Sequence, residues 1–239
     1  MKFYKDPFDS SILDNDVYKL ILDQTKDVER AGQEVERVTH GLIFGFAHVE
    51  AQNIRFFESH QFHLISLRSS FEYIQRSDEN VLPPDGFSVT AFTKDQTIQT
   101  EDIKKLALTI GEVNRYFKDK DIPMEKSLEI YMQWINNSLY HGFATRCFIA
   151  RNNDQSIGIC TVRVKEKSGE IDLFGIVPEY QNRKIGKYML QQALDYLRSK
   201  HVGTISVVTA GENTKANSFF ERNNFVLQRL DLVYHKHII

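Results

Sequence analysis

The chain is poor in several features that mark specialised classes of protein. It has two cysteines in 239 residues, Cys147 and Cys160, and both lie in apolar, strand-like runs. This excludes a disulfide-rich scaffold and predicts two reduced thiols in a core. No segment reaches the ~18 apolar residues that a membrane-spanning helix needs, and the N-terminal MKFYKDPFDSSILDND has no apolar signal-peptide core. We therefore expect a cytoplasmic protein.

The charge balance excludes another broad class. The net charge is −2, so nothing indicates nucleic acid as a partner, and an anionic ligand would need positive charge supplied locally. Hydrophobic residues make up 41% and charged residues 26% of the chain, which is typical of a globular protein with a substantial core.

A run of turn-forming residues divides the chain. The stretch SDENVLPPDGF has paired prolines and a glycine, which are typical of a turn or linker. We therefore predict an N-terminal α/β domain over residues 1–80, a linker over 81–87 and a second domain over 88–239. The first domain is expected to run strand, helix, strand, helix, strand, with its last three elements at GLIFGFAHV, AQNIRFFESHQ and HLISLRSSFEYIQ.

The second domain has a different order of elements. A strand at FSVTAF precedes helical segments, the second of them over about residues 126–140. An antiparallel meander follows at FATRCFIA, SIGICTVRV and EIDLFGIV. A helix over 185–200, a strand at TISVVTA, a helix at NTKANSFFERNN and a long strand at FVLQRLDLVYHKHI end the chain. This order predicts a mixed α/β (α+β) fold with helices covering a mixed sheet.

The stretch FGIVPEYQNRKIGKYML, residues 174–190, predicts an anion site. It reads as a buried strand, a short loop and the start of a helix. The first backbone N–H groups of a helix have no intrahelical partner, and the helix dipole adds positive potential there. Arg183, Lys184 and Lys187 add full charges, so the segment suits a pyrophosphate.

Two motifs of this second domain resemble those of the GNAT acyltransferase superfamily. Gln181, Asn182, Arg183, Lys184, Ile185 and Gly186 occupy the acyl-CoA-binding motif Gln/Arg-x-x-Gly-x-Gly/Ala. Asn213, Ala216, Phe219, Phe220, Asn224 and Phe225 occupy the helical motif Asn-x-x-Ala-x-x-Leu-Tyr-x-x-x-Gly-Phe. The resemblance covers roughly residues 87–239. It implies acetyl-CoA or another short acyl-CoA as co-substrate, no metal, and a sheet splayed after EIDLFGIV. It also implies pantetheine pairing near Phe174 and Ile176, with Gly175 easing the local bulge.

The sequence departs from these motifs at two positions. Lys184 stands where the first glycine is usual, and we expect ordinary helical φ and ψ angles there. Phe220 stands where many members have a tyrosine that protonates the departing thiolate. Phenylalanine has no such proton, so water or another group supplies it, or the thiolate leaves unprotonated.

Glu170 and Asp172 are the candidate general bases. They share one face of a strand, since side chains alternate. Glu170 lies where histone acetyltransferases of the superfamily carry their basic glutamate, and Asp172 lies nearer the expected splay. A solvent-facing acid pair, with water taking the proton, is the alternative.

The acceptor is read from a second, looser resemblance. Arg115, Tyr116 and Asp119, followed by Tyr131 and Trp134, resemble a pattern in nucleotide-sugar N-acyltransferases such as dTDP-fucosamine acetyltransferase. It implies that the first three bind the acceptor, and Tyr234 could face it too. A solvated helix end and a core tryptophan are the alternatives.

The histidines near the C-terminus do not predict a metal site. His235 and His237 share one side of a strand, but no Cys, Asp or Glu stands at ligand spacing beside them in the sequence.

Three functions remain open at this point. The first is an N-acyltransferase that acts on a dTDP-linked amino-dideoxy sugar for surface polysaccharide such as O-antigen, with an acetyl or 3-hydroxybutanoyl donor. The second is a GNAT enzyme for another amine, such as a peptide N-terminus, a polyamine or an antibiotic. The third is a non-catalytic CoA-binding module. The resemblance also implies a homodimer.

One phrase occurs twice in the chain. RFFESHQF over residues 55–62 repeats SFFERNNF over 218–225, with the common positions 163 apart. A strand precedes each copy and a long strand follows it. We therefore predict that the N-terminal domain is a degenerate half of a GNAT fold that serves as packing and acceptor scaffold.

Overall fold

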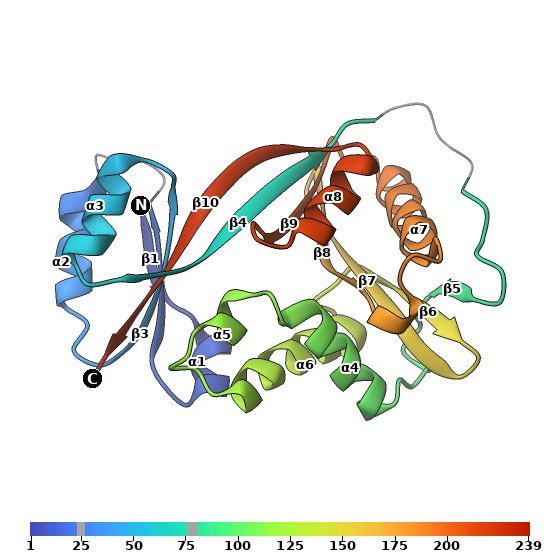
Figure 1. Ribbon diagram of the computed structural model, residues 1–239, viewed down its shortest axis with the longest axis horizontal. Helices are drawn as coiled ribbons and strands as arrows, with labels where there is room; N and C mark the ends of the chain where they lie inside the picture. The colour runs from blue at the N-terminus through green and yellow to red at the C-terminus, as the bar shows by residue number, and fades with distance from the viewer. Residues whose placement is uncertain (23–26, 76–80) are drawn as a thin grey trace.

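One mixed sheet of ten strands runs through both halves of the chain (Figure 1). The computed structural model describes residues 1–22, 27–75 and 81–239. The first half contains β1(Lys2–Lys5), α1(Pro7–Leu13), β2(Val17–Leu22), α2(Val28–Glu36), β3(Gly41–His48), α3(Ala51–Ser59) and β4(His63–Tyr73). The second half begins with β5(Ser88–Ala91), α4(Thr100–Gly111), α5(Arg115–Lys118), α6(Met124–Tyr140), β6(Arg146–Asn152) and β7(Gln155–Lys165). It ends with β8(Ser168–Ile176), the 3-10 helix η2(Pro178–Tyr180), α7(Ile185–Ser199), β9(Thr204–Ala210), α8(Thr214–Arg222) and β10(Phe225–Ile238).

The sequence predicted most of these elements. The expected mixed α/β class is confirmed, as is the antiparallel meander of β6, β7 and β8. The elements β1, α1 and α5 were not predicted, because each has only four to seven residues and shows no readable periodicity. Of the predicted boundary segment SDENVLPPDGF, residues 77–80 lie outside the described residues.

Two cores lie on opposite faces of the N-terminal strands. Along β3, Phe44 and Phe46 belong to the large core that continues into the second half, whereas Ile43 and Ala47 belong to a smaller core. The helices α2 and α3 cover that smaller core (Figure 1). Burial on both faces explains why GLIFGFAH reads as one continuous apolar run rather than as an alternating strand.

The strand order interleaves the two halves. It is β1-β2-β3-β10-β4-β9-β8-β7-β6-β5, so β10 lies between β3 and β4, and β4 lies between β10 and β9. Figure 1 shows β4 and β10 as a long twisted pair that joins the two ends of the molecule. Each strand–helix–strand unit, β3–α3–β4 and β9–α8–β10, therefore receives a central strand from the other unit, as a duplicated sequence with exchanged strands would.

The register of β4 and β10 follows the offset of the repeated phrase. Arg68 pairs with Asp231, which is 163 positions further along the chain, so the two are each other's counterparts. The ladder skips Ile65 on β4 and Gln228 on β10, and these two bulges are also 163 apart (228 − 65). A pseudo-two-fold axis thus passes between Arg68 and Asp231. The expected strand–helix–strand arrangement of the first copy is present.

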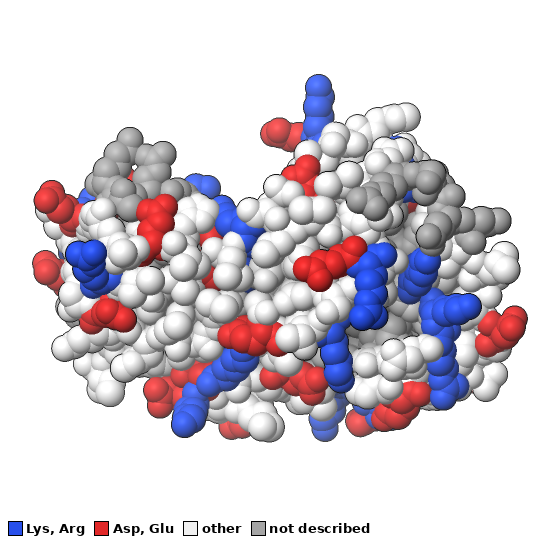
Figure 2. All heavy atoms as spheres, turned by 45° about the horizontal axis from the view of Figure 1, so that its top comes forward, with Lys and Arg blue, Asp and Glu red and all other residues white. Residues whose placement is uncertain are grey.

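The surface shows both signs of charge. Lysine and arginine are interspersed with aspartate and glutamate over the face in Figure 2. Within the described part of the chain, each helix is too short or too polar to cross a bilayer.

Candidate active site

The sheet opens between β8 and β9. These parallel strands pair only from Ser168 opposite Thr204 to Ile171 opposite Val207, although β8 runs to Ile176 and β9 to Ala210. Beyond that point, within the described parts of the chain, β8 pairs with β7 alone. Its other edge can therefore accept hydrogen bonds from an extended ligand. The corresponding strands of the first copy, β2 and β3, stay paired over six residues and do not open.

A bulge in β8 begins this opening. Asp172 and Leu173 together face Thr161 of β7, whose Oγ1 accepts the Leu173 N–H at 3.0 Å. The expectation that Gly175 eases the bulge is wrong, because the bulge lies three residues earlier. A β-carbon on Gly175 would lie 2.7 Å from Ile110 of α4, so glycine is needed there for helix packing.

The loop between β8 and α7 is tightly bent. Lys184 has φ 62° and ψ −1°, which is left-handed, and the expectation of ordinary helical angles is therefore wrong. The chain must reverse from η2 into α7 within four residues, and the family glycine would adopt this conformation without strain. Asn182 also has φ 62°.

This conformation predicts opposite effects for two neighbouring lysines. Replacing Lys184 by glycine should raise the free energy of unfolding by about 0.5–1 kcal/mol, because left-handed backbone costs a residue with a β-carbon about 1–2 kcal/mol. The matched change Lys187→Gly, in the first turn of α7, should lower it by up to about 1 kcal/mol. Urea unfolding of both variants tests this, and a destabilising Lys184→Gly would contradict it.

The loop side chains divide between structural and exposed positions. The Gln181 amide donates to the Ile176 carbonyl at 2.9 Å and so closes the end of β8. Arg183 and Lys184 are exposed, and the Arg183 guanidinium lies over the rings of Phe87 and Tyr180. Positive charge therefore stands at the surface beside the N-terminus of α7, as the sequence indicated.

Aromatic rings of β8 and α8 pack against one another beside the opening. Phe174 stacks on Phe219 of α8 with centroids 5.2 Å apart, and the Phe219 ring lies beside Gly186 of α7. Phe220, at the position of the family tyrosine, is 2% exposed and packs against Phe71, Phe174, Phe219 and Phe225. Asn213 caps α8 by accepting the Ala216 N–H at 3.1 Å.

Asp172 is the titratable side chain at the start of the opening. Its carboxylate is 4% exposed and accepts a hydrogen bond from Trp134 Nε1 at 2.9 Å and one from Arg163 at 2.6 Å. Burial raises the pKa of Asp172 to about 6, against the opposing effects of Arg163 and Trp134. Glu170 is 32% exposed and also contacts Arg163, at 3.1 Å. The sequence predicted both acids but missed Arg163, which only the β7–β8 register brings to them.

The four expected acceptor residues do not form one site. The Tyr116 hydroxyl donates to buried Asp9 at 2.9 Å, and Arg115 lies over the Tyr116 ring. Asp119 contacts His235 and His237. Tyr234 is 3% exposed and stacks on Phe57 in the smaller core, so it faces away from Asp119.

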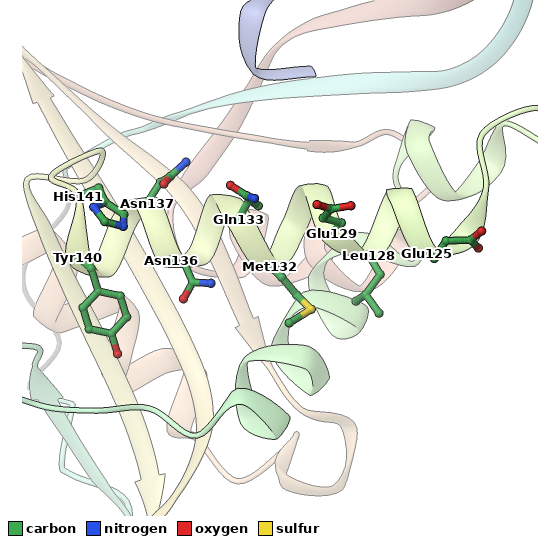
Figure 3. Close-up of a pocket in the computed structure, with 9 residues that line it drawn as sticks. All are labelled: Glu125, Leu128, Glu129, Met132, Gln133, Asn136, Asn137, Tyr140 and His141. Carbon is green, nitrogen blue, oxygen red and sulfur yellow. The ribbon is translucent and has the colours of Figure 1, made fainter. Parts of the chain in front are cut away.

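An open depression follows one flank of α6 (Figure 3). Its volume is about 700 Å³, and its lining consists of Glu125, Leu128, Glu129, Met132, Gln133, Asn136, Asn137, Tyr140 and His141. It shares no residue with the loop, the opening or the carboxylate at Asp172.

Comparisons with known proteins agree with this geometry. The model of the acetyltransferase (GNAT) family matches residues 113–225. N-alpha-acetyltransferase 30 of Schizosaccharomyces pombe is 30% identical over 118 residues, which cover 47% of this chain and 79% of that protein. The chain therefore belongs to the GNAT family, a family of acyl-CoA-dependent N-acyltransferases.

Two further likenesses add detail. Spore coat polysaccharide biosynthesis protein SpsD of Bacillus subtilis is 25% identical over 136 residues, or 57% of this chain. The match spans 47% of SpsD, about half its length. The structure of a GCN5-related N-acetyltransferase from Sphaerobacter thermophilus superposes with a TM-score of 0.60 at 11% identity, over 84% of this chain and 61% of that one. That likeness shows the fold alone.

Proposed function

We propose that the protein transfers an acetyl or other short acyl group from acyl-CoA to the amine of a nucleotide-linked amino sugar. One observation carries the transferase part: the opening between β8 and β9 begins at Asp172 and lies next to the charged N-terminus of α7. An acyl donor needs an extended edge for its pantetheine and an anion site for its pyrophosphate, and these two features lie side by side here.

Each part of the site has a proposed role. Residues 174–176 of β8 pair with the pantetheine, and the start of α7 with Arg183, Lys184 and Lys187 holds the pyrophosphate. Phe174 and Phe219 cover the thioester. Backbone N–H groups at the opening stabilise the negative charge that develops on the thioester oxygen.

Asp172 is the proposed base. It takes a proton from the attacking amine, Trp134 and Arg163 hold its carboxylate in place, and the CoA thiolate is the leaving group. Because Phe220 is buried among apolar rings, we propose that the thiolate leaves unprotonated or takes its proton from water.

The sugar acceptor rests on two lines of support. The acceptor-like pattern from Arg115 to Trp134 precedes the meander, and SpsD is by its name a polysaccharide biosynthesis protein. We propose that residues 1–80 form the acceptor scaffold, while residues 88–239 bind the donor.

A substrate panel tests this function. Thiol release from acetyl-CoA is measured with dTDP-linked amino sugars, with peptides and with spermidine. Turnover with amino sugars is the expected result. Turnover confined to peptides would instead favour N-terminal acetylation, which the likeness to N-alpha-acetyltransferase 30 makes the second candidate.

Arg183 separates donor binding from chemistry. We expect Arg183→Ala to raise KM for acyl-CoA about tenfold with little change in kcat, because the exposed guanidinium would contact phosphate rather than reacting atoms. Steady-state kinetics at varied acyl-CoA measures both constants. A lower kcat at saturating acyl-CoA would contradict this role.

A further inference from the structure

Asp119, His235 and His237 form a compact group, called here the Asp–His cluster. Oδ2 of Asp119 lies 2.5 Å from Nδ1 of His235 and 2.9 Å from Nε2 of His237. One ligand atom from each of the three side chains lies within 4.8 Å of the other two. Two imidazoles therefore converge on a single carboxylate oxygen, which a hydrogen-bonded core does not require.

The fold brings these residues together from distant parts of the chain. His235 and His237 lie on one face of β10, while Lys236 points to the other face and donates to the His60 carbonyl at 2.6 Å. Asp119 follows α5, 116 positions before His235. This separation explains why the sequence predicted no carboxylate beside the histidine pair.

The surroundings hold the cluster in a fixed geometry. The backbone N–H of Asp121 donates to Asp119 Oδ1 at 3.0 Å, which leaves Oδ2 facing the imidazoles. The His235 ring lies against Phe44 with centroids 4.3 Å apart. The hydrogen bond from Asp121 is the kind of outer contact that orients a ligating carboxylate in metal sites, and the Phe44 ring restricts the rotation of His235.

The cluster is largely shielded from water but open at one residue. Asp119 is 4% and His235 1% exposed, and Nε2 of His235 is buried with no hydrogen-bond partner among the described residues. The His235 nitrogen that faces Asp119 is Nδ1, and Nε2 lies on the far side of the ring. The His237 side chain is 27% exposed, so the cluster has one side open to solvent.

We propose that the Asp–His cluster binds one divalent transition-metal ion of the zinc class. Two imidazoles and one carboxylate are a usual three-ligand set for zinc, with a further position left open for water or another ligand. Each neutral imidazole turns its lone pair to the ion once its proton lies on the other ring nitrogen. The nearby Arg115 is paired with Asp9, with 3.8 Å between the charged atoms, which reduces its repulsion of a cation.

The ion would fasten the segment after α5 to the last strand. Because Asp119 directly follows α5, bound metal would fix the position of that helix against β10. The metal site does not depend on the proposed acyl transfer, since its residues are separate from the β8–β9 opening.

The test uses the purified full chain after treatment with EDTA. We expect titration with Zn²⁺ to saturate at about one ion per chain, and Co²⁺ to give the visible absorption bands of a low-coordinate site. At a free Zn²⁺ concentration 100 times Kd, Tm should rise by about 5–10 °C.

Three variants decide the assignment. His237→Gln, at the partly exposed position, and Asp119→Asn, which keeps the side-chain shape, should each bind Zn²⁺ at least about tenfold more weakly and lose the rise in Tm. His40→Gln removes an exposed histidine outside the cluster and should bind as the parent chain does. Failure of the parent chain to bind Zn²⁺ or Co²⁺ stoichiometrically would overturn the proposal, as would unchanged affinity in His237→Gln.

Discussion

Replacing Asp172 by asparagine should lower kcat/KM by about 10²-fold or more. Asparagine keeps the shape and can still accept the hydrogen bond from Trp134, but it cannot take a proton from the amine. A positioned general base contributes roughly 10²–10⁴-fold to a rate. Thiol release at saturating acyl-CoA, measured with the best amino sugar from the panel, gives the effect.

The pH dependence makes this prediction specific. Burial raises the pKa of Asp172 to about 6, so the carboxylate is protonated and inactive as a base below that pH. The parent activity should fall about tenfold per pH unit below about 6 and level off above it. The Asp172→Asn variant should lack this acidic limb.

Glu170 provides the matched control. It carries a carboxylate that contacts the same arginine, Arg163, but it is 32% exposed on a fully paired part of β8. Glu170→Gln should change the rate less than tenfold and keep the acidic limb. If Glu170→Gln instead removes that limb, Glu170 is the base, as the histone acetyltransferase resemblance implied.

Replacing Asp231 by alanine should lower the free energy of unfolding by about 3 kcal/mol. Asp231 is 2% exposed and its carboxylate contacts Arg68 at 2.8 Å, Arg229 at 3.0 Å and His48 at 3.4 Å. Removing one partner from a buried pair typically costs 3–5 kcal/mol, and the partial exposure of both arginines places the effect at the lower end.

Urea unfolding measures the effect, with an exposed ion pair as control. Asp195 is 53% exposed and pairs with Arg198 at i,i+3, so Asp195→Ala should cost less than about 0.5 kcal/mol. A loss at Asp231 no larger than at Asp195 would show that the paired centre of β4 and β10 contributes little.

The sequence predicted the strand–loop–helix order of the proposed donor site, but it missed contacts between distant segments. The donor loop lies within one strand–loop–helix stretch, where local spacing largely determines the geometry. Arg163 reaches Asp172 through strand register, and Asp119 reaches His235 across 116 positions. Contacts of this kind depend on sheet order, which the sequence alone did not supply.

The sequence also did not predict the left-handed backbone at Lys184. A positive φ is uncommon for a residue with a β-carbon, so nothing at Lys184 indicated one except the family glycine that it replaces. The structure shows that Lys184 has the left-handed conformation that a glycine adopts without strain.

The interleaved strand order has a consequence for how the protein can be divided. A cut in the linker would separate β4 from its neighbours β9 and β10, and would leave β3 paired with β2 but without β10. Neither piece would have a complete sheet. Each would have an unpaired strand edge at the place that the long strand of the other piece occupies in the whole protein. In this respect the chain resembles a strand-swapped dimer whose two subunits became one polypeptide. We expect the pieces to recover a folded state together, by complementation, and not alone.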